Sequence, residues 1–215
     1  IDISAIEKAI TPNTKAIVPV HLFGQCANMD AVMDLANKHN LFVIEDNAQA
    51  IGADYISKDG SSKKSGTIGH VASTSFFPSK NLGCYGDGGA IFTNDDELAH
   101  KIRGSVNHGM YKRYHHDVVG VNSRLDSIQA VVLRAKLKNL DLYNNARREA
   151  ARKYNSAFQG HSKIVTPQLS VNCNDICSTC TCHVFHQYTI QVDTDRDALA
   201  AHLNGLNIFQ YDYVF

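Results

Sequence analysis

The pattern that most constrains this chain is a helical segment flanked by two short apolar runs. Residues 16–20 and 41–44 have the length and composition of buried strands, and residues 30–39 between them carry apolar side chains at helical spacing. Strand, helix and strand in this order predict a βαβ unit with a parallel sheet. We expect Asp30 to cap the helix, because its carboxylate can accept from free amides of the first turn.

Further strands and helices follow along the chain. Residues 70–77 and 90–93 have the pattern of two more strands, and the glycine-rich segment 83–89 turns the chain between them. A helix capped at 94–95 should follow, and long helical patterns then fill residues 125–158.

The last part of the chain has a different composition. Residues 186–192 alternate like a strand with one exposed face, and Asp195 or Asp197 should open a final helix. We therefore predict that residues 1–139 belong to a large α/β domain and residues 140–215 to a small α+β domain.

Composition excludes several classes of protein. With 215 residues, 44% of them hydrophobic, the chain can bury a substantial core. Its 21 Lys and Arg residues balance 21 Asp and Glu residues, which argues against a nucleic-acid partner, because such proteins usually carry a basic excess. No apolar stretch of about 18 residues is present, and residues 1–10 lack the pattern of a signal peptide. These properties predict a cytoplasmic protein without a membrane span.

Six cysteines raise the question of a metal site. Cys26 and Cys84 stand alone, whereas the other four crowd into residues 173–182, close to His183 and His186. Zinc sites use such ligands, but the spacing C-x3-C-x2-C-x-C differs from paired CxxC motifs. We expect incidental thiols in a reducing compartment and no bound metal.

Asp46 and Lys80 are candidates for ligand binding. Asp46 follows the strand at 41–44, and in open α/β sheets ligands bind outside the carboxyl ends of the strands. Its carboxylate could face a cationic ring nitrogen, or it could form a turn or a helix cap. Lys80 follows the strand at 70–77, where it could form a Schiff base if its pKa is lowered, or remain a solvated loop lysine.

Asp46, Ser75 and Lys80 together favour one chemistry over these alternatives. Enzymes that use pyridoxal 5′-phosphate (PLP) need a Schiff-base lysine, an acidic partner for the pyridine nitrogen and groups that bind the phosphate. The three residues lie at or just beyond successive strand ends and can supply these groups. A dinucleotide-binding fold is not supported, because no GxGxxG motif follows the first strand.

Several long motifs resemble the DegT/DnrJ/EryC1/StrS family. They occupy residues 45–50, 75–90, 19–25 and 120–126, with Gln129 as a further match. The similarity covers nearly the whole chain. It implies a PLP-dependent nucleotide-sugar aminotransferase with the type I, aspartate aminotransferase-like α/β fold, in which residues 1–139 form part of the PLP-binding domain.

Two segments point to a subgroup of that family. Residues 24–30 and 113–120 are similar to those of UDP-2-acetamido-2-deoxy-3-oxoglucuronate aminotransferases, which make a 3-amino sugar for bacterial surface polysaccharide. The resemblance implies that an amino group moves from glutamate to a keto-sugar nucleotide, such as a UDP-3-keto-N-acetylglucosaminuronate.

The resemblance also implies roles for individual residues. Lys80 would form the Schiff base and carry the proton between C4′ and the substrate carbon, while Asp46 would keep the pyridine nitrogen protonated. Gln49 would lie against the cofactor ring or its 3-hydroxyl, and Ser75 would bind the cofactor phosphate. Asn122 would reach the phosphate bound by the neighbouring subunit, which implies a homodimer with shared active sites.

Arg124 and His21 have less specific roles. A guanidinium fork suits a carboxylate, so Arg124 would bind glutamate or the uronic acid, unless it is a surface arginine at a helix start. His21 could approach the cofactor, or it could be a histidine satisfied at a strand end.

The sequence also departs from the family pattern. Family members carry a segment before Ile1 that includes a phosphate loop, and a segment beyond Asn207 that closes over the sugar. We therefore expect an active site, and a fold, that are incomplete at both ends of this chain.

Two other functions stay open. One is a catalytically silent PLP-fold regulator or dimer scaffold, and the other is a dehydratase or isomerase of the same fold. Lys80 disfavours both, because its loss is the simplest silencing change and because the family's sugar dehydratases carry histidine in its place.

Overall fold

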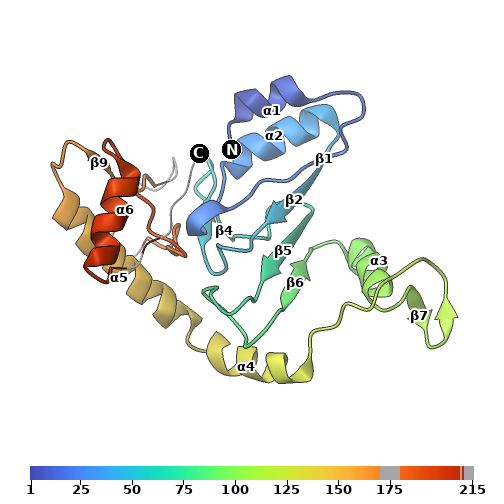
Figure 1. The fold of residues 1–215 in the computed structure, drawn as a ribbon. Coiled ribbons are helices and arrows are strands. Elements are labelled where there is room, and N and C mark those ends of the chain that lie inside the picture. Colours follow the sequence, from blue (N-terminus) through green and yellow to red (C-terminus); the bar gives the residue numbers. More distant parts are fainter. Residues whose placement is uncertain (170–179, 209, 211–215) are drawn as a thin grey trace.

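The computed structural model describes residues 1–169, 180–208 and 210 of the chain. Its centre is a four-stranded sheet in the order β1-β2-β5-β6 (Figure 1). The strands are β1 (Ala16–Ile17), β2 (Phe42–Asp46), β5 (Val71–Ser75) and β6 (Gly89–Phe92). Strands β1, β2 and β5 run parallel, and β6 runs antiparallel to β5. The predicted parallel βαβ unit is confirmed, and it brings the carboxyl ends of β1, β2 and β5 to one edge of the sheet.

Two helices cover one face of this sheet. Figure 1 shows α1 (Ile3–Ala9) and α2 (Met29–His39) side by side next to β1 and β2. The cap of α2 is Asn28, whose Oδ1 accepts from the amide of Ala31, so the prediction of Asp30 as the cap is wrong. The apolar stripe of α2 packs on the buried side of the strands, and the fully enclosed members of this core include Met29, Val32, Ala36 and Val43.

The two faces of the sheet differ in burial because side chains alternate along a strand. Val43 and Glu45 of β2 are buried, as are Ala72 and Thr74 of β5. The intervening positions of both strands are exposed or only partly buried. One face therefore belongs to the core, while the other remains open in this chain.

Two hairpins were not predicted from the sequence. β3 (Asp54–Ile56) pairs with β4 (Ser62–Lys64), and β7 (Met110–Lys112) pairs with β8 (His115–His116). Between β6 and β7 lies α3 (Asp96–Val106), which Asp95 caps as one of the two expected residues.

Helices dominate the second half of the chain. The long helical pattern forms α4 (Ser127–Leu137) and α5 (Leu140–Phe158), and Asp195 caps α6 (Arg196–Gly205). Short strands β9 (Ile164–Val165) and β10 (Gln191–Val192) pair with each other. In the described part of the chain, no helix has the length and apolar character needed to cross a bilayer. The domain boundary near residue 140 stays a prediction.

The predicted strand at 186–192 is wrong for most of its length, since only Gln191–Val192 is a strand. The carbonyls of Phe185 and His186 accept from the guanidinium of Arg147, and the carbonyl of Val184 accepts from Asn81. Of these carbonyls only that of His186 lies within the predicted strand, the amide of Gln187 donates to the carbonyl of Phe23, and Phe185 just before the strand adopts a left-handed φ of 43°. Alternation alone could not reveal these partners.

Candidate functional site

Asp46 and Ser75 share one face of the sheet at its carboxyl edge. Asp46 is the last residue of β2 and lies opposite Ser73 of β5. Since side chains two residues apart point the same way, Ser75 lies on the same face as Ser73 and Asp46, one step further along. That face is the open one, so both polar groups are accessible from it.

Both side chains keep hydrogen-bonding capacity for a ligand. Asp46 Oδ1 accepts from the amide of Ala48 at 3.0 Å, and no hydrogen bond from the described residues reaches its Oδ2. Ser75 Oγ accepts from the amide of Phe77 at 3.2 Å, which leaves its hydroxyl hydrogen available to donate. One edge therefore presents a free carboxylate oxygen and a free hydroxyl donor.

Lys80 lies in a tight turn that follows β5. Its amide donates to the carbonyl of Phe77 at 2.9 Å, and its side chain is half-buried. A Cβ on Gly83 would lie 2.4 Å from the carbonyl oxygen of Pro78, so only glycine allows the two sides of the loop to approach. The glycine that the sequence places after Lys80 therefore shapes the lysine's own turn.

Helix α4 holds the far side of this loop. Gln129 Oε1 accepts from the amide of Tyr85 at 2.8 Å, and Lys136 Nζ donates to the carbonyl of Gly83 at 2.6 Å. These contacts give Gln129, which the motif matches had singled out, a positioning role in the glycine-rich segment.

Gln49 is oriented by a backbone amide. Its Oε1 accepts from the amide of Phe23 at 2.6 Å, which assigns the other end of its side chain as the NH2 group. Phe23 belongs to the short 3-10 turn Leu22–Gly24 and has a left-handed φ of 60°. The Nε2 group of Gln49 is thus the end that remains to donate to a ligand.

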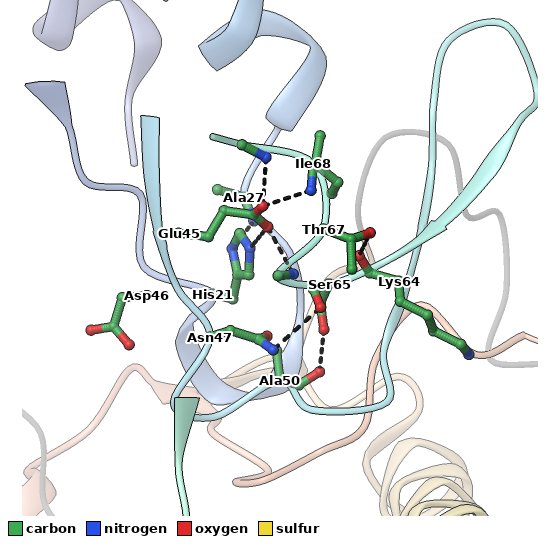
Figure 2. Close-up of polar contacts among 12 residues, drawn as sticks. His21, Ala27, Glu45, Asp46, Asn47, Ala50, Lys64, Ser65, Thr67 and Ile68 are labelled. Carbon is green, nitrogen blue, oxygen red and sulfur yellow. Dashed lines mark hydrogen bonds and ion pairs between the residues drawn. The ribbon is translucent and has the colours of Figure 1, made fainter. Parts of the chain in front are cut away.

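A buried pair lies on the opposite side of β2. Figure 2 shows Glu45 and His21 pointing toward each other, while Asp46 points away from them. His21 Nε2 lies 2.8 Å from Glu45 Oε2, and both side chains are fully buried. His21 Nδ1 accepts from the amide of Ala27, so the ring proton is on Nε2 and the imidazole is neutral. His21 is therefore a satisfied strand-end histidine, which decides between the two roles that the sequence left open.

The carboxylate of Glu45 accepts four hydrogen bonds from the described residues. Besides His21, the amides of Gly66, Ile68 and Gly69 donate to it at 2.6–2.8 Å (Figure 2). Burial alone would raise the pKa of this carboxyl. The bonds from His21 and from the amides of Gly69 and Ile68 outweigh that effect and hold the pKa of Glu45 below its usual value. This carboxylate ties β2 to the loop before β5 and supports the site from behind.

Asn122 and Arg124 lie elsewhere in the chain. Asn122 pairs with Asn107 in an isolated bridge, and its Oδ1 accepts from Arg124 Nε at 3.1 Å. Both side chains are exposed, and no hydrogen bond or ion pair of the described residues joins either of them to Lys80. Arg124 lines a cavity of about 920 Å³ beside β6 and α3. Of the six predicted residues, the described structure places Asp46 and Ser75 on one face of the sheet, and no side-chain hydrogen bond of the described residues joins the other four to them.

Sequence reasoning missed a polar cluster beside Lys80. Asn81 is buried and bonds to Asn144 of α5, to the carbonyl of Val184 and to His186. Its position next to the lysine was the available signal, but the partners lie more than sixty residues away in the chain.

The cysteine cluster extends beyond the described residues, which exclude Cys173 and Cys177. Cys26 and Cys84 are buried free thiols, whereas Cys180 is disulfide-bonded. The expectation that all the thiols are incidental is therefore wrong for Cys180. Within residues 1–169, 180–208 and 210, no group of three or more His, Cys, Asp or Glu side chains is arranged to hold a metal.

Comparison with known proteins identifies the family. A sequence model described as the DegT/DnrJ/EryC1/StrS aminotransferase family matches residues 1–213. The chain belongs to this family. The predicted resemblance is confirmed over nearly the whole sequence.

Three relatives illustrate the similarity. The chain is 50% identical over 206 residues to UDP-N-acetyl-3-dehydro-alpha-D-glucosamine 3-aminotransferase of Acidithiobacillus ferrooxidans, covering 95% of this chain and 52% of that protein. It is 46% identical over 208 residues to UDP-2-acetamido-2-deoxy-3-oxo-D-glucuronate aminotransferase of Pseudomonas aeruginosa, covering 97% and 54%. The solved structure of NtdA from Bacillus subtilis with bound cofactor PMP has a TM-score of 0.82 and 34% identity, covering 98% of this chain and 46% of that one.

These matches confirm the fold class. The chain has the α/β fold of the type I PLP-dependent transferases. It spans about half the length of the curated relatives it matches.

Proposed function

We propose that the polypeptide carrying this chain is a PLP-dependent nucleotide-sugar aminotransferase with Lys80 as its catalytic lysine. The observation that carries the proposal is the shared placement of Asp46 and Ser75 on the open face of adjacent parallel strands, with Lys80 in the turn that follows. Ligands of open α/β sheets bind at this edge. The family membership of the chain supports the same reading.

The groups at the sheet edge fit PLP chemically. Asp46 Oδ2 is free to accept from a pyridinium N–H, and Ser75 Oγ is free to donate to a phosphate oxygen. Gln49 has its Nε2 left to donate to the 3-oxygen of the ring. When bound, PLP supplies an electron sink for charge that develops on the substrate carbon. Asp46 would keep that sink effective by holding the ring-nitrogen proton, and Lys80 Nζ would hold and move the proton at the substrate carbon.

The proposed substrates are glutamate and a UDP-linked 3-keto-N-acetyl sugar, for amino-sugar or surface-polysaccharide biosynthesis. The names of the relatives from A. ferrooxidans and P. aeruginosa support this class. The sugars in the names of these two relatives differ, because only the one from P. aeruginosa carries a uronate carboxylate. Arg124 is the proposed carboxylate ligand, so Arg124→Gln should weaken the binding of a uronate substrate, of glutamate, or of both. Competition between the two UDP-sugars would show which one the protein prefers.

A homodimer with shared sites is part of the proposal. α4 exposes Ile128 and Val131 at 71% and 68%, and the segment before it exposes Val119 at 99%. Apolar side chains gathered in this way are typical of a protein interface. Asn122 lies between these segments, which supports a role for it across the interface at the partner's cofactor. The cytoplasmic location expected from the sequence also belongs to this proposal.

The deciding experiment is reduction of the PLP-loaded full polypeptide with borohydride. Mass spectrometry of its peptides should find the cofactor fixed to Lys80, and Lys80→Ala should carry no label. Lys136→Ala is the control, because Lys136 is a lysine that bonds to the same loop at Gly83 and should leave labelling intact. A stable label on Lys80→Ala would refute the assignment, and PLP binding without any labelled lysine would favour the silent scaffold.

A further inference from the structure

Two turns at the carboxyl edge of the sheet hold or carry three of the candidate residues. The glutamine turn, residues 47–52 after β2, carries Gln49, and one of its amides donates to Asp46 Oδ1 at 3.0 Å. The lysine turn, residues 77–82 after β5, carries Lys80. A ligand that all three side chains bind needs the two turns to be held at one spacing, because each turn takes its own residues with it when it moves.

Asn81 anchors the lysine turn to the interior of the protein. Its side chain is buried, and its Nδ2 donates to the carbonyl of Val184 at 3.2 Å and to Asn144 Oδ1 at 2.7 Å. Because a carbonyl can only accept, the orientation of the Asn81 amide is fixed, and its Oδ1 accepts from His186 Nδ1 at 3.1 Å. Three partners therefore hold the residue that directly follows Lys80.

Asn144 connects this anchor to the glutamine turn. It lies on α5, and its side chain is only 1% exposed. Since its Oδ1 accepts from Asn81, the other end of its amide is the donor, and this Nδ2 donates to the carbonyl of Ile51 at 3.2 Å. Each end of the Asn144 amide thus meets its complement, and a continuous path of hydrogen bonds runs from the lysine turn through α5 to the glutamine turn.

The surroundings leave Asn144 little room to move. Gly52 ends the glutamine turn with a left-handed φ of 86°, and a Cβ there would lie 2.7 Å from Asn144 Nδ2. Leu140, one helical turn earlier on α5, belongs to a buried apolar cluster with Leu82 of the lysine turn, and Ile51 of the glutamine turn packs against that cluster. A buried amide in this place is costly to leave unpaired, so its hydrogen bonds keep both turns in register.

We propose that Asn144 is a positioning residue that holds the lysine turn and the glutamine turn at the spacing a bound cofactor needs. It acts through Asn81 on one turn and through Ile51 on the other. This inference rests on the proposed function of Lys80. When the link is lost, the lysine turn shifts relative to the ring, and Lys80 moves the proton at the substrate carbon more slowly. Misplacement by about 1 Å can cost about 100-fold in rate.

The first test measures a single turnover of the PLP-loaded full polypeptide with saturating glutamate, followed through the visible absorbance of the bound cofactor. It compares the wild type with Asn144→Ala, Asn81→Ala and the double variant. A loss of folded protein lowers the amplitude of this reaction but leaves its rate constant unchanged, so the rate constant reports positioning. Asn155→Ala is the matched control, because this asparagine also lies on α5 but accepts from Tyr188, outside both turns, at 2.6 Å.

The expected result is a shared effect of the two asparagines. Asn144→Ala should lower the rate constant by about 10-fold or more, and Asn81→Ala should lower it by at least as much. The double variant should be no slower than Asn81→Ala alone, because both residues belong to one link. Asn155→Ala should keep the wild-type rate constant.

Two outcomes would overturn the inference while borohydride still fixes the cofactor to Lys80. One is a wild-type rate constant in Asn144→Ala. The other is a double variant whose loss is the product of the two single losses, since independent sites combine in that way. Absence of any cofactor on wild-type Lys80 would instead overturn the proposed function and this inference with it.

The second test measures hydrogen exchange of the full polypeptide without cofactor. It follows the amide of Lys80, which donates to Phe77 in the lysine turn, and the amide of Ala53, which donates to Ala50 of the glutamine turn. Asn144→Ala should speed exchange at both amides by about 5-fold and leave the amides of β2 and β5 at their wild-type rates. Unchanged exchange in the two turns, or an equal increase throughout the protein, would contradict a positioning role.

Asn144→Asp separates the two links and replaces Asn144→Ala if that variant does not fold. Its carboxylate still accepts from Asn81 but can no longer donate to the carbonyl of Ile51. Exchange should therefore rise in the glutamine turn and stay at the wild-type rate in the lysine turn. Faster exchange in the lysine turn alone would refute the path of hydrogen bonds through Asn144.

Discussion

His21 donates its Nε2–H to Glu45 Oε2 at 2.8 Å, and neither side chain is reached by solvent. Glu45 immediately precedes Asp46, so the strand that presents Asp46 on the open face is fixed from the core side by Glu45. Adjacent residues of β2 thus divide two tasks, one structural and one proposed to be catalytic.

Glu45→Gln should destabilise the protein by about 3 kcal/mol. The substitution removes the negative charge and replaces one of the two buried acceptor oxygens with an NH2 donor. The NH2 of glutamine would face amides such as those of Ile68 and Gly69, which are also donors. Thermal and denaturant unfolding would measure the loss. Glu7→Gln is the matched control, since Glu7 makes an exposed ion pair with Lys38 whose loss should leave Tm almost unchanged.

The same pair predicts an acid dependence. The folded pKa of Glu45 is lowered, so its contribution to stability is present above the unfolded value of 4.5 and is lost as pH falls through the lower, folded value. The difference in unfolding free energy between the wild type and Glu45→Gln should therefore shrink on acidification below about pH 4.5. A difference that stays constant down to pH 3 would contradict the assignment of Glu45 as an anion in the folded state.

Asp46→Asn should keep the fold but lower turnover by at least about 100-fold, because a neutral partner no longer holds the ring-nitrogen proton. The asparagine oxygen can still accept from the amide of Ala48, so Tm should change little. Steady-state rates with glutamate and a keto-sugar nucleotide would measure the effect. Turnover within about tenfold of wild type, or about 1.4 kcal/mol in the barrier, would remove Asp46 from this role.

Much of the fold and the sheet edge followed from the sequence for a physical reason. Apolar runs such as those around Val43 and Ala72 mark buried strands, and parallel strands must end at one edge. Asp46 and Ser75 could therefore be placed there before any contact was known. The cap of α2 at Asn28 was missed because Asp30, two residues later, satisfies the same local preference.

Other features depend on partners that are distant in sequence. At the start of the strand expected at 186–192, the carbonyl of His186 accepts from the side chain of Arg147. The hydrogen bonds of Asn81 to His186 and to Asn144 of α5 likewise join segments that are distant in sequence, and no local pattern encodes them. His21 could not be assigned until Ala27 and Glu45 were seen on its two nitrogens.

Gly52→Ala should be more destabilising than Gly60→Ala, although both glycines have left-handed φ values, 86° and 82°. Each alanine pays about 1 kcal/mol for that backbone conformation. At Gly60 the added Cβ meets open space, whereas at Gly52 it would lie 2.7 Å from Asn144 Nδ2. The clash should add about 1–3 kcal/mol and weaken the link from Asn144 to Asn81. Equal shifts in Tm for the two variants would show that Asn144 moves aside without loss.

Mixed dimers of Lys80→Ala and Asn122→Ala should recover activity that neither variant has alone. In a twofold dimer with shared sites, one mixed site receives both lesions and the other receives neither. The exposure of the Asn122 side chain, between segments that expose the apolar side chains of Val119 and Ile128, motivates this expectation. The control is a mixture of Lys80→Ala with Asp46→Asn, which should recover nothing, because both residues serve the site of their own subunit and every mixed site keeps one lesion. Subunit exchange is verified with two affinity tags. If exchange occurs and the first mixture stays inactive, Asn122 acts within its own chain or has no part in the site. That result would refute the proposal of a dimer with shared active sites.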